Sequence, residues 1–288
     1  MNILLTGHGL LGEALAHRLV SMGHKVRVIS REHRPGAEWE VKVGCFYDFD
    51  FLLQCMEGID VVVHNAACQE NREDLRSHIL YIKPNFMGTL NVFYAAAVNN
   101  VHVVAASSEV VTGFYAWDAA YFGRALYYNE NTAYNPKNIY DMSKVFMEQI
   151  GRYYRDNHGL SITLLRYGNF WPPEKSLCPD FVWKLNMNCV HLDDVVEATL
   201  LAIGYRPQGE YLILADKPFR KGDEIELYKD TAKVMKCYYP EEMRWWEEKG
   251  LPIKPITWWG DIAMAKKHLQ YSPKWNFSYA VNKLREIL

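Results

Sequence analysis

The chain has 288 residues, 49% of them hydrophobic and 23% charged, with a formal net charge of −2. This composition is typical of a globular protein of one large domain or two small ones. The near-neutral charge argues against a nucleic-acid or membrane-surface partner, and no apolar run approaches the length of a membrane span. The six cysteines form no C-x-x-C pair, and the first strand leaves no room for a signal peptide. We therefore expect reduced thiols, a cytoplasmic location and no metal site.

A glycine-rich turn separates the first predicted strand, at residues 3–5, from the first predicted helix. The turn reads Thr6-Gly7-His8-Gly9-Leu10-Leu11-Gly12. In a dinucleotide site, the first glycine permits the tight turn, the second admits a pyrophosphate and the third lets the helix pack close to the strand. The free N–H groups at the start of the helix then bind the pyrophosphate. An ordinary glycine-rich turn is the alternative, but the alternating strands and helices that follow favour the dinucleotide site.

Strands and helices alternate through the first part of the chain. Further strands are predicted at 25–29, 41–46, 60–64, 101–106 and 161–165, and helices at 86–98 and 138–157. Strands that are separated by such helices pair through right-handed crossovers, which predicts an α/β fold with a Rossmann-type doubly wound parallel sheet. We expect a dinucleotide-binding domain at 1–166, to which 189–206 and a strand near 211–214 return. A small C-terminal substrate-binding lobe is expected at 167–188 and 215–288.

The end of the second predicted strand bears on the choice of cofactor. NAD sites place an acidic residue there to bind the ribose diol, but this chain has Ser30 followed by Arg31. A hydroxyl and a guanidinium suit a 2′-phosphate, so we favour NADP and retain NAD as possible. In the alternative, Arg31 is a solvated loop residue and Glu32 takes the place of the acid.

A tyrosine and a lysine stand four residues apart on the second long predicted helix. Tyr140 and Lys144 therefore share one face of that helix. A phenol with a pKa of about 10 is a poor base at neutral pH, but a neighbouring ammonium and a cationic nicotinamide would favour the phenolate. Ser108 follows the fifth strand, at the sheet edge where ligands bind, and we expect it to meet Tyr140 over a substrate oxygen. The alternative is a pair of surface side chains.

The chain resembles the extended short-chain dehydrogenases/reductases of the NAD-dependent epimerase/dehydratase family. The resemblance covers roughly residues 2–200, and its core is similar to the compact uronate-dehydrogenase branch. The segments that carry it, in order, are Val63-His64-Asn65-Ala66-Ala67, Asn85-Phe86-Met87-Gly88-Thr89-Leu90-Asn91, Ser107-Ser108-Glu109-Val110-Val111-Thr112-Gly113, Arg166-Tyr167-Gly168-Asn169-Phe170-Trp171-Pro172-Pro173 and Val190-His191-Leu192-Asp193-Asp194-Val195.

The resemblance implies a set of site residues and a dimer. The implied catalytic residues are Ser108, Tyr140, Lys144 and Asn85, the last as a support for the proton relay. The implied cofactor-binding residues are Gly7, His8, Gly9, Leu10, Leu11, Gly12, Ser30, Arg31, Asp48, Asn65, Ala66, Ala67, Tyr140, Lys144, Tyr167 and Asn169. The resemblance also implies a homodimer formed through the helices that carry Asn85 and Tyr140.

Several readings of the function follow. The sequence favours an NAD(P)-dependent oxidoreductase that acts on a secondary alcohol or ketone of a sugar or sugar acid. Dehydration is disfavoured because Val110, which cannot abstract a proton, stands where the family's dehydratases carry a second acidic residue. A nucleotide-sugar epimerase of the same family and a non-catalytic NADP-sensing regulator are the alternatives. Trp245, Trp246, Trp258 and Trp259 either line a substrate pocket or pack in a core or interface, and we favour packing.

Overall fold

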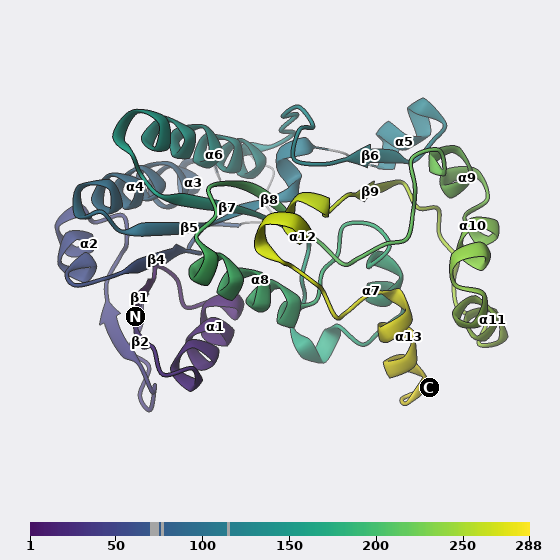
Figure 1. Cartoon of the computed structure of the whole chain (residues 1–288), viewed down its shortest axis with the longest axis horizontal. Helices are drawn as coiled ribbons and strands as arrows, with labels where there is room; N and C mark the ends of the chain where they lie inside the picture. The colour runs from purple at the N-terminus through teal and green to yellow at the C-terminus, as the bar shows by residue number, and fades with distance from the viewer. Residues whose placement is uncertain (70–74, 76–77, 114–115) are drawn as a thin grey trace. The chain divides into compact units, whose positions relative to one another are not determined.

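A computed structural model describes residues 1–69, 75, 78–113 and 116–288 of the protein. Its main sheet has seven strands in the order β3-β2-β1-β4-β5-β7-β8 (Figure 1). The neighbouring pairs from β3 to β5 are all parallel, which confirms the predicted Rossmann-type sheet. The strands span Asn2–Leu5 (β1), Lys25–Ser30 (β2), Glu40–Val43 (β3), Val61–His64 (β4), His102–Ser108 (β5), Ile162–Tyr167 (β7) and Gly209–Ile213 (β8).

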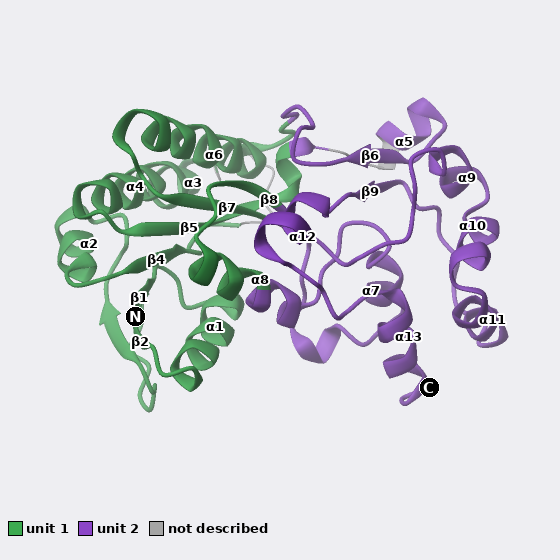
Figure 2. Ribbon diagram, viewed as in Figure 1, with its two compact units in different colours: residues 1–111, 136–166, 198–211 green, residues 112–135, 167–197, 212–288 purple. Residues whose placement is uncertain are grey.

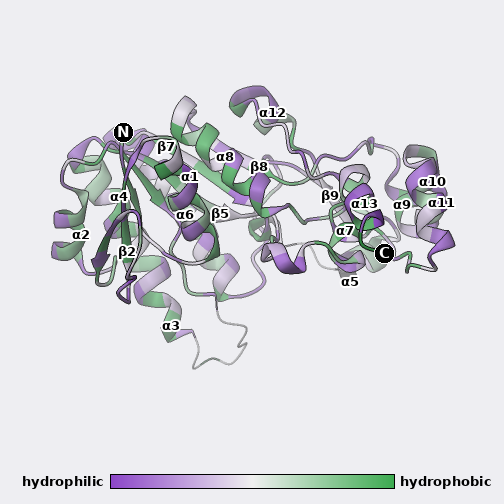
Figure 3. Cartoon of the chain, turned by 90° about the horizontal axis from the view of Figure 1, so that it is seen from below, coloured by the Kyte–Doolittle hydropathy of each residue, from purple (hydrophilic) through white to green (hydrophobic). Residues whose placement is uncertain are grey.

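Helices cover both faces of this sheet. In Figure 1, α2, α4 and α6 lie on one face and α1 lies on the other. These helices span Leu10–Ser21 (α1), Phe49–Met56 (α2), Gly88–Asn99 (α4) and Ile139–His158 (α6). The central strands are apolar without alternation because both of their faces are covered, and every residue of β4 is buried. Hydrophobic residues accordingly concentrate in the strands of the sheet in Figure 3.

Local sequence features explain the formation of α1 and α6, both of which the sequence predicts as helices. In α1, the leucines at positions 11, 15 and 19 are all buried, which is the spacing of one helix face. In α6, the Asn138 side chain accepts a hydrogen bond from the Asp141 N–H at the first turn. The helix ends at Gly159, whose φ of 66° is the left-handed conformation that glycine adopts readily.

The predicted helix at 86–98 begins earlier and less regularly than expected. The short helix α3 (Ile79–Tyr81) continues into a π-helical segment at Ile82–Met87 and then into α4. Pro84 lies inside this segment, and a proline has no N–H for the regular helical hydrogen bond. π-Helical turns are frequent at functional sites, and this one carries Asn85. A short 3-10 helix, Glu109–Thr112, follows β5.

The chain divides into two compact units, coloured separately in Figure 2. Unit 1 comprises residues 1–111, 136–166 and 198–211, and unit 2 comprises the rest of the described chain. The predicted domain places 112–135, 189–197 and 212–214 with the dinucleotide-binding part, whereas this division places these residues in unit 2. The reason at 112–135 is the pairing of β6 (Leu126–Tyr128) with β9 (Trp258–Gly260), which the sequence analysis did not foresee.

Unit 2 has its own aromatic core. Trp183, Trp246 and Phe277 are fully buried and contact one another with ring centroids 5.4 to 5.9 Å apart. The helices of this unit include Ala116–Phe122 (α5), Pro179–Lys184 (α7), Glu224–Lys229 (α9), Thr231–Tyr238 (α10), Pro240–Glu248 (α11), Ala263–Leu269 (α12) and Phe277–Arg285 (α13), and a 3-10 turn spans Pro173–Lys175. The helix α8 (Leu192–Tyr205) has residues in both units. None of the described helices is both long and apolar enough to cross a membrane.

The glycine turn after β1 is shaped by three glycines with different surroundings. A Cβ on Gly12 would overlap the carbonyl oxygen of Gly7 and lie 2.8 Å from Nδ2 of Asn65. A Cβ on Gly7 would lie 3.0 Å from the Cα of Ala66. A Cβ on Gly9 would have no neighbour within 4 Å. The protein itself therefore requires glycine at position 12 and leaves space at position 9.

We predict effects of very different size on stability from the same substitution at two glycines. Gly12→Ala should lower the free energy of unfolding by at least about 3 kcal/mol, because its methyl group meets backbone atoms that cannot move aside. Gly9→Ala should cost less than about 1 kcal/mol, because the methyl group enters open space. Urea denaturation of both variants measures this difference. Equal destabilisation of the two variants would contradict the packing described for the turn.

Candidate active site

The glycine turn is held by the segment that follows β4. Oδ1 of Asn65 accepts a hydrogen bond from the Gly7 N–H at 3.1 Å, and its Nδ2 donates to the Gly7 carbonyl at 3.0 Å. Gly9 is the N-cap residue of α1 and supplies no side-chain cap. The first N–H groups of α1 are therefore available to an external anion.

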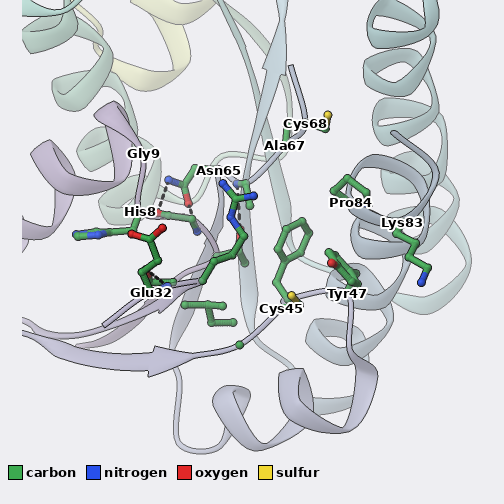
Figure 4. A pocket seen from close by; sticks show the side chains of 18 of the residues that line it. His8, Gly9, Glu32, Cys45, Tyr47, Asn65, Ala67, Cys68, Lys83 and Pro84 are labelled. Carbon is green, nitrogen blue, oxygen red and sulfur yellow. Dashed lines mark hydrogen bonds between the residues drawn. The ribbon is translucent and has the colours of Figure 1, made fainter. Parts of the chain in front are cut away.

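A cavity of about 710 Å³ opens beside this turn, within unit 1. Figure 4 shows Asn65 and His8 on one side of it, Cys45 and Tyr47 below, and Pro84 and Lys83 on the other side. Of the predicted cofactor residues, those that line the cavity are Gly7, His8, Gly9, Ser30, Arg31, Asn65, Ala66 and Ala67. Burial, followed by the positive charge of Arg34, lowers the pKa of His8, so its imidazole is neutral at pH 7.

Four of the predicted cofactor residues have other roles or positions among the described residues. Asp48 is the N-cap of α2 and accepts a hydrogen bond from the Phe51 N–H at 3.2 Å. Leu11 is buried in the face of α1 that packs on the sheet, and Gly12 provides the close contact with Gly7. Leu10 is 38% exposed at the start of α1. None of these four is among the residues that line the described cavity.

The end of β2 brings three polar residues to the cavity. Ser30 is buried, and its Oγ accepts a hydrogen bond from the Glu32 N–H at 3.2 Å. Arg31 and Glu32 are exposed and also line the cavity. Within the described part of the chain, Arg31 and Arg34 make no ion pair, so both guanidinium groups are available to an anion.

Tyr140 and Lys144 lie at the start of α6, one helical turn apart. Lys144 is buried, and its Nζ donates a 2.7 Å hydrogen bond to the carbonyl of Ala106 in β5. This bond fixes the helix against the end of β5, two residues before Ser108. Nζ also lies 5.5 Å from the centre of the Tyr140 ring. The i, i+4 spacing therefore places the two side chains together, as predicted.

Burial shifts the pKa values of Tyr140 and Lys144 in opposite directions. It raises the pKa of the Tyr140 phenol, with smaller contributions from Asp141, Tyr81 and Glu109. It lowers the pKa of the Lys144 ammonium to about 8, while the negative charge of Glu148 raises it. The expected lowering of the phenol pKa is therefore not found in the protein alone. Desolvation of the phenolate outweighs the attraction of the ammonium, and the phenol keeps its proton at neutral pH.

Asn85 connects the π-helical segment to two other parts of unit 1. Its Oδ1 accepts from the Cys68 N–H at 2.6 Å, and its Nδ2 donates to the Cys68 carbonyl and to Oγ of Ser143, both at 3.0 Å. Ser143 Oγ in turn donates to the carbonyl of Tyr140 at 2.7 Å. Asn85 thus braces the backbone that carries Tyr140, a role in orientation that is more specific than the predicted support of a proton relay.

A buried hydrogen-bonded histidine was missed as part of the site. His64 at the end of β4 contacts Thr6 Oγ1 through Nδ1 at 3.0 Å and Thr89 Oγ1 through Nε2 at 3.1 Å. Burial, and then the charge of Lys144, lowers its pKa to about 3, so the ring is neutral. Thr89 lies four residues after Asn85, so the two side chains share one helix face. This spacing is the sequence signal that could have placed Thr89, the partner of His64, near Asn85. The ring thereby joins the glycine turn to the helix of Asn85.

Tyr167 and Asn169, the last predicted cofactor residues, belong to unit 2. Tyr167 is buried, and Asn169 forms an isolated parallel bridge with Cys189. His191 stacks on Trp275 with ring centroids 3.8 Å apart and accepts a hydrogen bond from the Asp193 N–H. Over the described residues, no group of three or more His, Cys, Asp or Glu side chains is arranged to hold a metal ion. Phe114 and Tyr115, in the long segment between Ser108 and Tyr140, lie outside the described residues.

Known proteins share the sequence and the fold of this chain. A model of the NAD-dependent epimerase/dehydratase family matches residues 3–213. An L-arabinose 1-dehydrogenase (NAD(P)(+)) of Haloferax volcanii is 32% identical over 179 residues, which are 58% of this chain and 66% of that protein. A uronate dehydrogenase of Pseudomonas syringae pv. tomato is 28% identical over 177 residues, 59% of this chain and 60% of that protein. The chain thus spans less than two thirds of the length of either relative.

Solved structures have the same fold. A short-chain dehydrogenase/reductase superfamily protein from Agrobacterium tumefaciens, with bound NAD, gives a TM-score of 0.72 at 17% identity and covers 100% of this chain and 98% of its own. A UDP-glucuronic acid 4-epimerase from Bacillus cereus in complex with NAD gives 0.68 at 17% identity, with 100% and 99% covered. The match of the family model over most of the sequence, together with this fold, establishes that the chain belongs to the NAD-dependent epimerase/dehydratase family.

Proposed function

We propose that the protein is an NAD(P)-dependent oxidoreductase that transfers a hydride to or from a secondary alcohol or ketone of a sugar or sugar acid. The observation that carries this proposal is the hydrogen bond from Lys144 Nζ to the Ala106 carbonyl, with Tyr140 one turn earlier on the same helix. It puts an acid/base pair beside the end of β5, in the unit that also contains the dinucleotide-sized cavity. Ligands bind at this edge of parallel sheets.

The residues around the cavity fit a dinucleotide. The N–H groups at the start of α1 and the open space at Gly9 suit a pyrophosphate. The hydrogen bond between Asn65 and Gly7 holds the turn in place. Ala66 and Ala67 line the cavity with small side chains that leave space for a ligand. When bound there, the cofactor supplies or accepts the hydride.

The proposed roles follow from the positions of the side chains. Tyr140 donates its phenolic proton to the substrate oxygen in reduction and accepts a proton in oxidation. Lys144 supplies the positive charge that favours the phenolate, and Ser108 donates a hydrogen bond to the carbonyl oxygen. Asn85 orients the first turn of α6 through Ser143. Because burial keeps the phenol protonated in the free protein, reduction needs no prior ionisation of Tyr140.

The substrate class is inferred from the relatives. The relatives described above are named as dehydrogenases of arabinose and of uronates. A UDP-glucose 4-epimerase of Lactobacillus helveticus, 29% identical over 179 residues that cover 58% of this chain and 51% of that protein, supports epimerisation as the second candidate, because the same trio of side chains serves both reactions. A dehydrogenase changes the net absorbance of the nicotinamide during turnover. An epimerase inverts the substrate without that net change.

Replacing Tyr140 separates an enzyme from a cofactor-sensing protein. Tyr140→Phe removes the proton donor, so turnover should fall by about 10²- to 10⁴-fold, while the dissociation constant of the cofactor stays within about twofold. Steady-state kinetics with pentoses and uronates, and cofactor titration by fluorescence, measure the two quantities. Tyr154→Phe is the matched control, because Tyr154 is a partly buried tyrosine of the same helix. Turnover that is intact in Tyr140→Phe would refute the proposed mechanism.

We further propose that NADP is preferred over NAD. Ser30 and Arg31 offer a hydroxyl and a free guanidinium at the cavity, which suit a 2′-phosphate. Arg34 adds a second cation at the same edge. Glu32 lines the cavity too, and it is the group that would serve the ribose diol of NAD.

Two neighbouring substitutions test this preference in opposite directions. Arg31→Ala should weaken NADP binding by about tenfold or more, with little effect on NAD, because it removes a charge-assisted contact to the phosphate. Glu32→Gln should strengthen NADP binding or leave it unchanged and weaken NAD binding. Titration calorimetry with both cofactors gives, for each variant, the dissociation constants of NADP and NAD relative to those of the unmodified protein. Tighter binding of NAD than of NADP by the unmodified protein would overturn the preference.

A homodimer formed through α4 and α6 is also proposed. On α4 and the turn before it, Met87, Leu90, Tyr94 and Val98 form an exposed apolar stripe at helical spacing. Met142 and Tyr153 are exposed on α6, which lies beside α4 on the same face of the sheet (Figure 1). Exposed apolar residues on two adjacent helices are typical of a subunit interface.

A charge in the stripe should separate the subunits. Leu90→Arg buries a cation in the proposed interface, and light scattering should then report the mass of one chain where the unmodified protein gives two. Ile225→Arg is the control, since Ile225 is a comparably exposed aliphatic residue on α9 of unit 2. The interface assignment fails if Leu90→Arg keeps the mass of the unmodified dimer, or if the unmodified protein has the mass of one chain.

A further inference from the structure

Three charged side chains recur every fourth residue along the face of α6 that packs on the sheet. Lys144 Nζ donates to the Ala106 carbonyl of β5. Four residues later, Oε1 of Glu148 accepts a 2.5 Å hydrogen bond from Ser107 of the same strand. Arg152 then pairs with Glu210 of β8 at 2.6 Å. One helix face is thereby joined to two different strands by polar contacts.

The middle contact of this row is a buried ion pair. Arg166 of β7 donates from Nε to Oε1 of Glu148 at 2.9 Å and from Nη2 to Oε2 at 2.7 Å. The side chains of Arg166 and Glu148 are 1% and 0% exposed. Burying two charges costs about as much as their attraction returns, so such a pair adds little net stability. Its geometry, by contrast, is specific, because the guanidinium fork and the carboxylate fit in one orientation.

Glu148 therefore connects the elements that carry the proposed acid/base group. It stands on the helix of Tyr140 and Lys144, and its carboxylate holds the residue directly before Ser108 as well as Arg166 of β7. We propose that Glu148 is a positioning residue that fixes Lys144 and Ser108 relative to each other and keeps Lys144 in its cationic form. This inference rests on the proposed function, because it assigns Glu148 a role in that same reaction.

The electrostatic part of the proposal depends on the groups around Lys144. Burial lowers its pKa to about 8, and the charge of Glu148 opposes that loss of the proton. The other groups that act on Lys144, on its partner Tyr140 or on Glu148 are His64 of β4, Tyr81 of α3, Glu109 after β5, Asp141 and Arg152 of α6, and Arg166 of β7. His64 is neutral, and Glu109 and Asp141 act on the phenol. Among the described residues, Glu148 is the carboxylate that raises the pKa of Lys144.

This arrangement determines the direction in which the pH profile should move when the charge of Glu148 is removed. Lys144 must be protonated to favour the phenolate, so activity should fall as the pH rises past the pKa of Lys144. Removing the negative charge of Glu148 lowers that pKa further. The alkaline limb of the pH profile of kcat/KM should then move to lower pH, by about one pH unit, which is the size expected for the interaction of two nearby unit charges.

The experiment uses two variants and a control. Glu148→Gln keeps the shape of the side chain and removes its charge, but it leaves Arg166 buried without a counter-ion and so destabilises the fold. The double variant Glu148→Gln/Arg166→Met removes the unpaired cation and should recover stability. Arg155→Gln removes a cation of the same helix that pairs with Asp156 and should leave the alkaline limb where it is in the unmodified protein.

Two readouts distinguish the possible results. The first is the pH profile of kcat/KM at saturating cofactor. The second is the titration of the Lys144 side chain by NMR in lysine-labelled protein, with its signal assigned by Lys144→Met. We expect both to move to lower pH in Glu148→Gln and to stay below the unmodified protein in the double variant. A Lys144 titration that does not move in Glu148→Gln would show that Glu148 acts through packing alone and would overturn the proposal.

The NMR titration also separates this proposal from the proposed function. It reports on Lys144 and Glu148 whether or not the protein turns over a sugar. If Tyr140→Phe leaves turnover intact, the proposed function fails, while a lowered Lys144 titration in Glu148→Gln would still establish the electrostatic link. If Tyr140→Phe abolishes turnover and the Lys144 titration does not move, the function stands and the role of Glu148 fails.

Discussion

The cavity depends on the contact between the glycine turn and the segment after β4. Asn65 binds both the N–H and the carbonyl of Gly7, and Gly12 packs against Gly7 because it has no side chain. This contact fixes the start of α1 at the edge of the sheet where β1 and β4 end. The N–H groups of its first turn have no competing side-chain cap. Backbone packing, and no charged side chain, thus positions the N–H groups that the proposed pyrophosphate would bind.

Much of the fold and part of the site could be predicted because their signals are local. Apolar runs such as Val61 to Val63 are buried on both faces, and the sequence shows this directly. The pair of Tyr140 and Lys144 follows from a four-residue spacing on one helix. Ser108 follows from its place at the carboxyl end of a strand. Each of these inferences needs only the chain on either side of the residue.

The parts that were missed depend on partners far apart in the sequence. β6 and β9 pair although more than a hundred residues separate them, and neither three-residue strand has a pattern of its own. Glu148 carries no sign that Arg166 and Ser107 meet its carboxylate. Asp48, which the resemblance implies as a cofactor residue, has a local role that the sequence analysis did not weigh. An acidic residue near the expected cofactor site caps a helix, which is the more frequent use of aspartate before a helical segment.

Burial also explains why the charge of Lys144 is not enough to ionise the Tyr140 phenol in the protein by itself. In the protein by itself, desolvation disfavours the phenolate of Tyr140 and the ammonium of Lys144 alike, so both groups are driven towards their neutral forms. Tyr140 is then ready to give a proton but not to take one. To act as a base it needs additional positive charge, and an oxidised nicotinamide beside it would supply that charge. In the proposed oxidation, Tyr140 would therefore become competent only with the cofactor in place, whereas the proposed reduction would start from the protonated phenol of the folded chain. Under this proposal, the same desolvation that raises the pKa of the phenol makes the direction of the reaction depend on the charge of the bound cofactor.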